Sequence, residues 1–176
     1  MNKQFLWKMI ALCIILAFAG CASSPSAKVQ TSTPKIQRVS NEFFNAEIEP
    51  LLSKDGRLYN AFHISVTNKT GGDLFIEWNQ TYYLYNGKKA GLFLWEGIDW
   101  EALEKAKKHP LVKLTAGITH TSEIFPQKLV GRDPKISKTS QMYLRGFLPA
   151  GENGVLLTVK KGDKKIEEKM TVLIKE

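Results

Sequence analysis

Residues 58–68, which read Leu-Tyr-Asn-Ala-Phe-His-Ile-Ser-Val-Thr-Asn, decide the fold class of this chain. Along this stretch Phe62, Ile64 and Val66 alternate with polar residues, so the large apolar side chains fall on one face of an extended chain. A period of two residues is typical of a β-strand that is buried on one face only. The stretch therefore predicts a strand and, with it, a β-rich domain.

Similar short segments, separated by turn residues, follow on both sides of this strand. Turns are indicated at residues 54–57, 70–73, 85–88 and 161–164, and Asn86-Gly87 is a pair that favours a two-residue hairpin turn with positive φ. Further strands are predicted at Phe43–Glu49, Leu74–Trp78, Gly91–Leu94, Thr119–Phe125, Gly154–Lys160 and Lys165–Ile174. Repeated short strands at this spacing predict an all-β, antiparallel sandwich.

One segment interrupts this pattern and predicts a short inserted helix at about residues 99–108. Asp99 is a suitable N-cap, and Pro110 follows the expected end of the helix. Trp100 and Leu103 share one face of such a helix. We expect that face to cover an apolar part of the sheet.

The aromatic segment 75–100 is the candidate binding region. Tyr83, Tyr85, Phe93 and Trp95 alternate with other residues and should share one face of the sheet. Two roles are open for this face. It either packs under the helix at 99–108 as part of the core, or forms an exposed platform on which sugars stack. The degree of burial of these four rings distinguishes the two.

The N-terminal residues have the composition of a secretory signal. Lys3 and Lys8 supply positive charge, and an uninterrupted apolar run extends from Met9 to Phe18. A membrane-spanning helix needs roughly 20 apolar residues, about twice the length of this run. We therefore interpret residues 1–20 as a signal peptide that is removed.

The sequence Phe18-Ala19-Gly20-Cys21 resembles the lipobox of bacterial lipoprotein precursors. The resemblance implies cleavage directly before Cys21, attachment of diacylglycerol to its sulfur and acylation of its new amino group. Ala22 follows the cysteine where an aspartate would favour retention at the inner membrane, so the resemblance favours the outer membrane, facing the periplasm. Two or more acyl chains on Cys21 would anchor the protein stably.

The part after the lipobox divides into a tether and a domain. Residues 21–40 are rich in Ser, Thr, Pro, Ala and Lys, which predicts a flexible tether that reaches roughly 60 Å when fully extended. Residues 41–176 are long enough for one domain with its own core. The chain has two cysteines. Because Cys13 leaves with the signal peptide and Cys21 carries lipid, no disulfide is expected in the mature protein.

A second resemblance concerns the domain. This resemblance rests on the residues Ile76-Glu77-Trp78-Asn79-Gln80-Thr81-Tyr82, Asn86-Gly87, Gly97-Ile98, Pro110, Ala116-Gly117-Ile118 and Ile124-Phe125-Pro126. Together they resemble a group of small, uncharacterised lipoproteins from Gram-negative bacteria, over roughly residues 47–126. The resemblance implies an immunoglobulin-like sandwich. It carries no catalytic residue, because the shared positions are mostly packing and turn residues.

The sequence contains none of the common catalytic or cofactor motifs. His-Glu-x-x-His, Cys-x-x-Cys, Gly-x-Ser-x-Gly and Gly-x-Gly-x-x-Gly do not occur, and the histidines at 63, 109 and 120 do not cluster. The acidic residues Glu96, Asp99 and Glu101 are better explained by helix capping than as a glycosidase pair. We therefore expect no enzyme activity, no cofactor and no metal.

The predicted function is that of a lipid-anchored cell-envelope protein with a non-enzymatic structural or protein-binding role. Its partners would be the membrane, through Cys21, and an envelope protein that pairs with an exposed edge strand. The full chain has a net charge of +8, which becomes +6 when Lys3 and Lys8 leave with the signal peptide, and this charge fits contact with anionic lipid. It does not indicate nucleic acid, which the predicted compartment excludes. The alternative is a glycan- or peptidoglycan-binding module that uses the aromatic segment 75–100.

Overall fold

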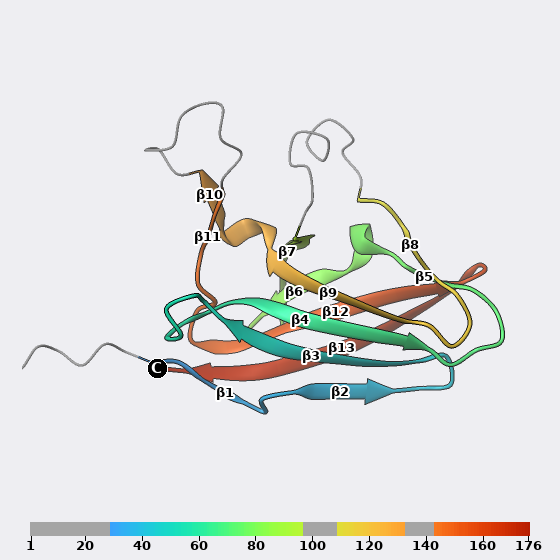
Figure 1. Cartoon of the computed structure of the whole chain (residues 1–176), viewed down its shortest axis with the longest axis horizontal. Helices are drawn as coiled ribbons and strands as arrows, with labels where there is room; N and C mark the ends of the chain where they lie inside the picture. The colour runs from blue at the N-terminus through green and yellow to red at the C-terminus, as the bar shows by residue number, and fades with distance from the viewer. Residues whose placement is uncertain (1–28, 97–108, 133–142) are drawn as a thin grey trace, which may run out of the picture.

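The computed structural model of the chain describes residues 29–96, 109–132 and 143–176 (Figure 1). The predicted signal peptide at 1–20, the predicted lipidation site Cys21 and the predicted helix at 99–108 lie outside the described residues. The described residues belong to the β-domain and to the short segment that leads into its first strand.

The described residues form thirteen strands and two short 3-10 helices, with no longer helix among them. The strands are β1 (Thr31–Thr33), β2 (Gln37–Ser40), β3 (Phe44–Leu52), β4 (Tyr59–Asn68), β5 (Leu74–Ile76), β6 (Tyr82–Tyr85), β7 (Lys88–Trp95), β8 (Val112–Leu114), β9 (Thr119–Pro126), β10 (Val130–Arg132), β11 (Tyr143–Arg145), β12 (Gly151–Lys161) and β13 (Lys164–Lys175). The 3-10 helices are η1 (Trp78–Gln80) and η2 (Gln127–Leu129).

Eleven of these strands belong to one antiparallel sheet that curls around the core. Its strand order is β1-β13-β12-β6-β7-β9-β4-β3-β2, while β5 pairs with β12 and with β8. β1 and β2 stand at opposite ends of this order but are consecutive in the chain, at most about 13 Å apart across the link from Thr33 to Gln37. The curl therefore brings the two ends of the sheet together, and Figure 1 shows β1 and β2 along one edge of the molecule.

The prediction of an antiparallel β domain is confirmed. Each predicted strand has an observed counterpart, although β5 stops at Ile76 and Trp78 begins a 3-10 helix. The Asn-Gly turn is also confirmed, because Asn86 and Gly87 have φ values of 48° and 75°. Six strands have no predicted range, namely β1, β2, β6, β8, β10 and β11. Each has only three or four residues.

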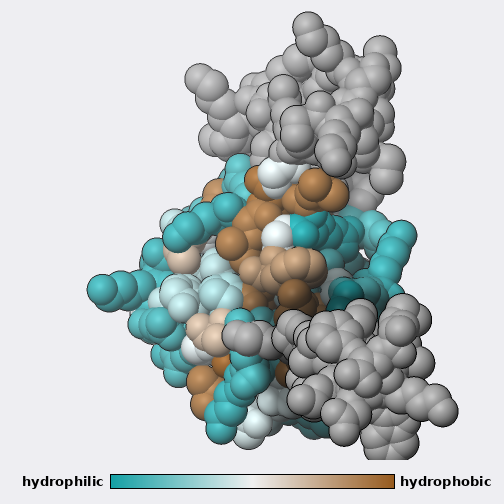
Figure 2. All heavy atoms as spheres, turned by 90° about the vertical axis from the view of Figure 1, so that its left-hand side faces the viewer, coloured by the Kyte–Doolittle hydropathy of each residue, from teal (hydrophilic) through white to brown (hydrophobic). Residues whose placement is uncertain are grey.

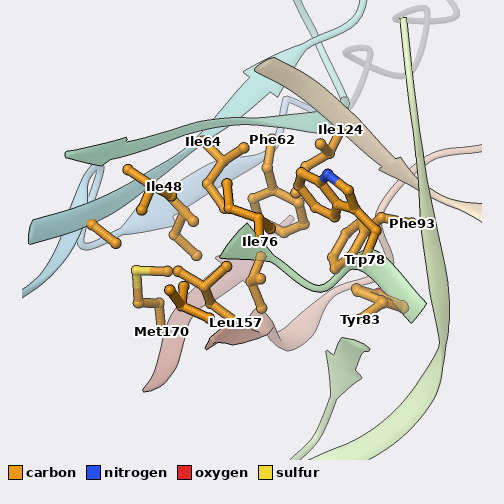
Figure 3. Packing of buried hydrophobic residues seen from close by; sticks show 14 of the residues in the cluster. Ile48, Phe62, Ile64, Ile76, Trp78, Tyr83, Phe93, Ile124, Leu157 and Met170 are labelled. Carbon is orange, nitrogen blue, oxygen red and sulfur yellow. The ribbon is translucent and has the colours of Figure 1, made fainter. Parts of the chain in front are cut away.

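The core lies between the layers of the curled sheet (Figure 3). Ile48 and Ile64 point from one layer toward Leu157 and Met170 on the other, and all four side chains are buried. Along β4 the buried apolar residues alternate with partly exposed polar residues, as the sequence predicts. The inner apolar faces of the two layers pack against each other and are removed from water. The domain is therefore stabilised by its own core.

The tether predicted at residues 21–40 is wrong for its last part. Residues 31–33 pair with β13, residues 37–40 pair with β3, and the side chain of Val39 packs against the core. The ordered domain therefore includes residues 31–40, ahead of the predicted boundary at 41. The cause is that both strands are short and are stabilised by partners distant in sequence, which a local polar composition does not reveal.

Gln30 fixes the start of the domain. Its side chain is buried, with Nε2 donating to the Leu148 carbonyl oxygen at 3.0 Å and Oε1 accepting from the Tyr59 backbone N at 2.8 Å. Its own backbone N donates to the Arg57 carbonyl oxygen at 2.8 Å. One residue thus connects the N-terminal end of the domain to two other segments.

We expect Gln30→Ala to lower the free energy of unfolding by about 1–2 kcal/mol, because it leaves two backbone groups without their hydrogen-bond partner. Gln37→Ala is the matched control, since within the described residues the Gln37 side chain bonds only to the exposed carbonyl oxygen of neighbouring Arg38. Denaturant unfolding of both variants measures the difference. Equal stability of the two variants would show that Gln30 does not fix the domain start.

Candidate functional site

The aromatic segment forms part of the core and not an exposed strip. Tyr83 and Phe93 are 2% and 0% exposed, and their ring centroids lie 6.0 Å apart. Phe62 of β4 covers Phe93, with ring centroids 6.3 Å apart. The alternative of an exposed sugar platform is therefore ruled out for these two residues, because a stacked sugar needs an exposed ring face. For Phe93 the covering ring belongs to β4 of the same curled sheet.

Tyr85 and Trp95 lie at the rim of the core and are half-buried. The Tyr85 hydroxyl donates to the Ala150 carbonyl oxygen at 3.0 Å. The Trp95 ring packs against Trp78, with centroids 5.6 Å apart, and against His109 at 5.4 Å. Both rings are thus engaged within the domain.

The Tyr83 hydroxyl is held inside the core by a polar contact. It donates to Asn153 Oδ1 at 2.5 Å, and Asn153 Nδ2 in turn donates to the carbonyl oxygens of Pro149 and Gly151. Burial raises the pKa of Tyr83 well above its usual value. The phenol therefore remains neutral and serves as a structural donor.

His109 is the most buried of the three histidines. Asn79 holds its backbone through two hydrogen bonds, of 2.9 Å to the carbonyl oxygen and 2.8 Å from the amide N. Burial lowers the pKa of His109, and its Nδ1 has no hydrogen-bond partner among the described residues. No group of three or more His, Cys, Asp or Glu side chains suited to a metal ion occurs in the described ranges.

A polar hollow of about 570 Å³ lies on the outer face of β2, β3, β4 and β9. It is lined by Arg38, Val39, Ser40, Asn45, Ala46, Glu47, Ser65, Thr67 and Thr119. The polar side chains point outward because they alternate with core residues along each strand. Sequence reasoning missed this hollow, since its residues come together only through the register of four strands.

The polar groups of the hollow bond mainly to one another. Arg38 Nε and Glu47 Oε2 lie 2.9 Å apart, Ser40 donates to Asn45 Oδ1 at 2.7 Å, and the hydroxyls of Thr67 and Thr119 lie 2.8 Å apart. No pair among the lining residues joins a nucleophile to a general base. Such a surface can exchange these bonds for those of a polar partner.

The opposite end of the same outer face is covered. The ribbon of β10 and β11 packs there over a small second core of Ala61, Leu94 and Phe125. The Arg145 guanidinium lies 4.2 Å from the Phe125 ring centroid and forms an ion pair with Glu123. The outer face is thus apolar and covered at one end, and polar and open at the other.

Two further findings bear on the class of protein. In the part of the chain that the structure describes, no helix is both long and apolar enough to cross a membrane. In comparisons with known proteins, no family model, no curated protein and no solved structure matches the chain.

Proposed function

We propose that this chain is a lipid-anchored cell-envelope protein with a non-enzymatic structural or protein-binding role. The observation that carries the proposal is the closeness of the lipobox-like cysteine to the ordered domain. Seven residues, 22–28, separate Cys21 from Val29, and Gln30 is already held by three hydrogen bonds. Fully extended, that link reaches about 26 Å. A lipid on Cys21 would keep the domain beside the membrane, at the outer membrane and facing the periplasm.

For the domain we propose an immunoglobulin-like sandwich. The support is that β7 pairs with β6 through its first part and with β9 through Phe93–Trp95, so that it joins two packed layers. β1 and β2 likewise lie on different layers. A strand that passes from one layer to the other is a usual way to turn the corner of a β-sandwich.

The protein-binding role would use the edge strand β2. It stands at one end of the sheet order, and its outward side chains Arg38 and Ser40 line the polar hollow. An extended segment of a partner can add to an exposed edge by backbone hydrogen bonds, while side-chain contacts provide specificity. The glycan-binding alternative through residues 75–100 has less support, because Tyr83 and Phe93 have no exposed ring face.

The test of the anchor is acylation. We expect Cys21→Ala to abolish metabolic labelling of the protein by palmitate and to leave the leader uncleaved, because the sulfur that accepts the lipid is gone. Cys13→Ala is the matched control and should label like the unchanged protein, since Cys13 leaves with the leader. Mass spectrometry of the purified chains checks both. Equal labelling of Cys21→Ala and the unchanged protein would refute the anchor.

A further inference from the structure

Exposed apolar side chains gather at the end of the domain where residue 29 enters it. Of the seven large apolar residues that are exposed in the described ranges, four are at this end: Val29 at 54%, Leu52 at 45%, Leu144 at 55% and Phe147 at 47%. Figure 2 looks at this end and shows a band of hydrophobic residues across it. We call these four residues the end surface.

Hydrogen bonds hold the segments of the end surface together. Val29 precedes Gln30, whose side chain bonds to the Leu148 carbonyl oxygen and the Tyr59 backbone N. Leu52 pairs with Tyr59, and Phe147 precedes Leu148, whose backbone N donates to the Tyr59 carbonyl oxygen at 2.7 Å. Leu144 lies on β11, three residues before Phe147. The apolar side chains therefore project from a fixed backbone.

We propose that the end surface docks on the lipid surface of the membrane. The proposal rests on acylation of Cys21, which the proposed function includes. A link of seven residues holds Val29 within about 26 Å of the lipid on Cys21, so that docking of the end surface is an intramolecular event at high effective concentration. Exposed apolar side chains gathered on one surface often mark such an interaction site.

The positive charge beside the end surface also favours contact with the lipid surface of the membrane. Lys54 and Arg57 lie in the exposed β3–β4 turn, next to Leu52 and Tyr59. Arg57 forms an ion pair with Asp55 of the same turn at 3.1 Å, so the turn carries a net charge of +1, which Lys54 supplies. Basic side chains at a bilayer surface keep their charge among the headgroups while their stems lie against apolar groups, and they are attracted by anionic lipid. The domain would thus dock with apolar residues inserted and cations at the rim.

Docking by this end orients the domain. β4 runs from Tyr59 at the end surface to Asn68 at the far end, a length of about 30 Å. Ile118 lies at that far end, where its carbonyl oxygen accepts from the Asn68 backbone N. Thr67 and Thr119 of the polar hollow lie beside it. The docked domain therefore presents the hollow to the water, away from the lipid.

The test uses the full-length, acylated chain in vesicles of phosphatidylethanolamine and phosphatidylglycerol. Phe147→Cys and Ile118→Cys each receive an environment-sensitive fluorophore, and these positions are matched because both side chains are about half exposed and apolar. Lipidated Cys21 does not compete for the label. We expect a blue shift at position 147 and quenching there by brominated lipid, with little of either at position 118. Equal water exposure of the two labels would overturn the proposal.

A second measurement uses a label at Leu144→Cys. Adding Leu52→Ser and Phe147→Ser should lower the ratio of docked to undocked domain at least about tenfold, because burial of large apolar side chains supplies the attraction. Adding Ile118→Ser should leave the ratio unchanged. An unchanged ratio in the double variant would overturn the proposal.

The outcomes separate docking from anchoring. Acylated protein whose label at 147 is not quenched by brominated lipid would overturn docking alone, whereas absence of acyl chains on Cys21 would overturn both proposals. Energy transfer between labelled copies, without quenching by lipid, would assign the end surface to a second copy of the chain and overturn docking.

Discussion

Trp78→Ala is expected to lower the free energy of unfolding by about 3–5 kcal/mol, as truncation of a buried large aromatic usually does. Trp78 is 1% exposed, although it lies in a 3-10 helix and not in the strand that precedes it. Its ring contacts Trp95, and its neighbours belong to the main core. The loss is a large share of the roughly 5–15 kcal/mol that stabilises an ordinary domain.

Denaturant unfolding of a chain that begins at Ala22, and so lacks the proposed lipidation site, measures this loss. The chain must include residues 30–40, because they form part of the sheet. Trp95→Ala is the control and should cost less, since Trp95 is only half-buried. A loss below about 1 kcal/mol for Trp78→Ala would be outside the range for a buried aromatic and would contradict its place in the core.

Gly154→Ala is expected to cost about 3 kcal/mol, at the upper end of the range for overpacked positions. Gly154 pairs with Thr171 on β13. A Cβ at this position would overlap the carbonyl oxygen of Met170 and lie 2.7 Å from Thr171 Cγ2. The obstruction by Met170 is backbone and cannot rotate away, so the two longest strands of the sheet would have to separate locally.

Gly71→Ala provides the matched control, because a Cβ at Gly71 would meet no atom within 4 Å. It should change the free energy of unfolding by no more than about 0.5 kcal/mol, as surface substitutions usually do. The same denaturant unfolding compares the two variants. If the two variants have the same free energy of unfolding, β12 and β13 do not approach each other closely at Gly154.

The long strands could be predicted because alternation reports burial directly. In β4 each large apolar residue from Phe62 to Val66 is fully buried, so the local pattern and the tertiary structure agree. The short strands could not be predicted in this way. β1 depends on β13 and on Gln30, whose partner Leu148 lies 118 residues away. Contacts between residues so far apart in the sequence cannot be recognised from the local sequence pattern.

The aromatic segment shows a different limit of the same reasoning. Alternation correctly placed Tyr83 and Phe93 together, but it does not say which face of a strand is covered. Leu84 and Leu94, on the other face, are buried as well. For Leu94 the cause is the ribbon of β10 and β11. Where both faces of a strand are buried, only the structure shows which face packs into the main core and which is covered by another segment.

The direction of β1 has a mechanical consequence if the protein is held by its N-terminus, as we propose. A pull on Cys21 would reach the domain at Val29 and act along β1, which pairs with β13 at three positions. Hydrogen bonds between antiparallel strands stand perpendicular to the strand axis, so such a force shears all the pairs together and does not peel them apart one by one. The load then passes through the Thr33–Gln37 link to β2 on the other layer. Strain on such an anchor would thus be shared by both layers of the domain.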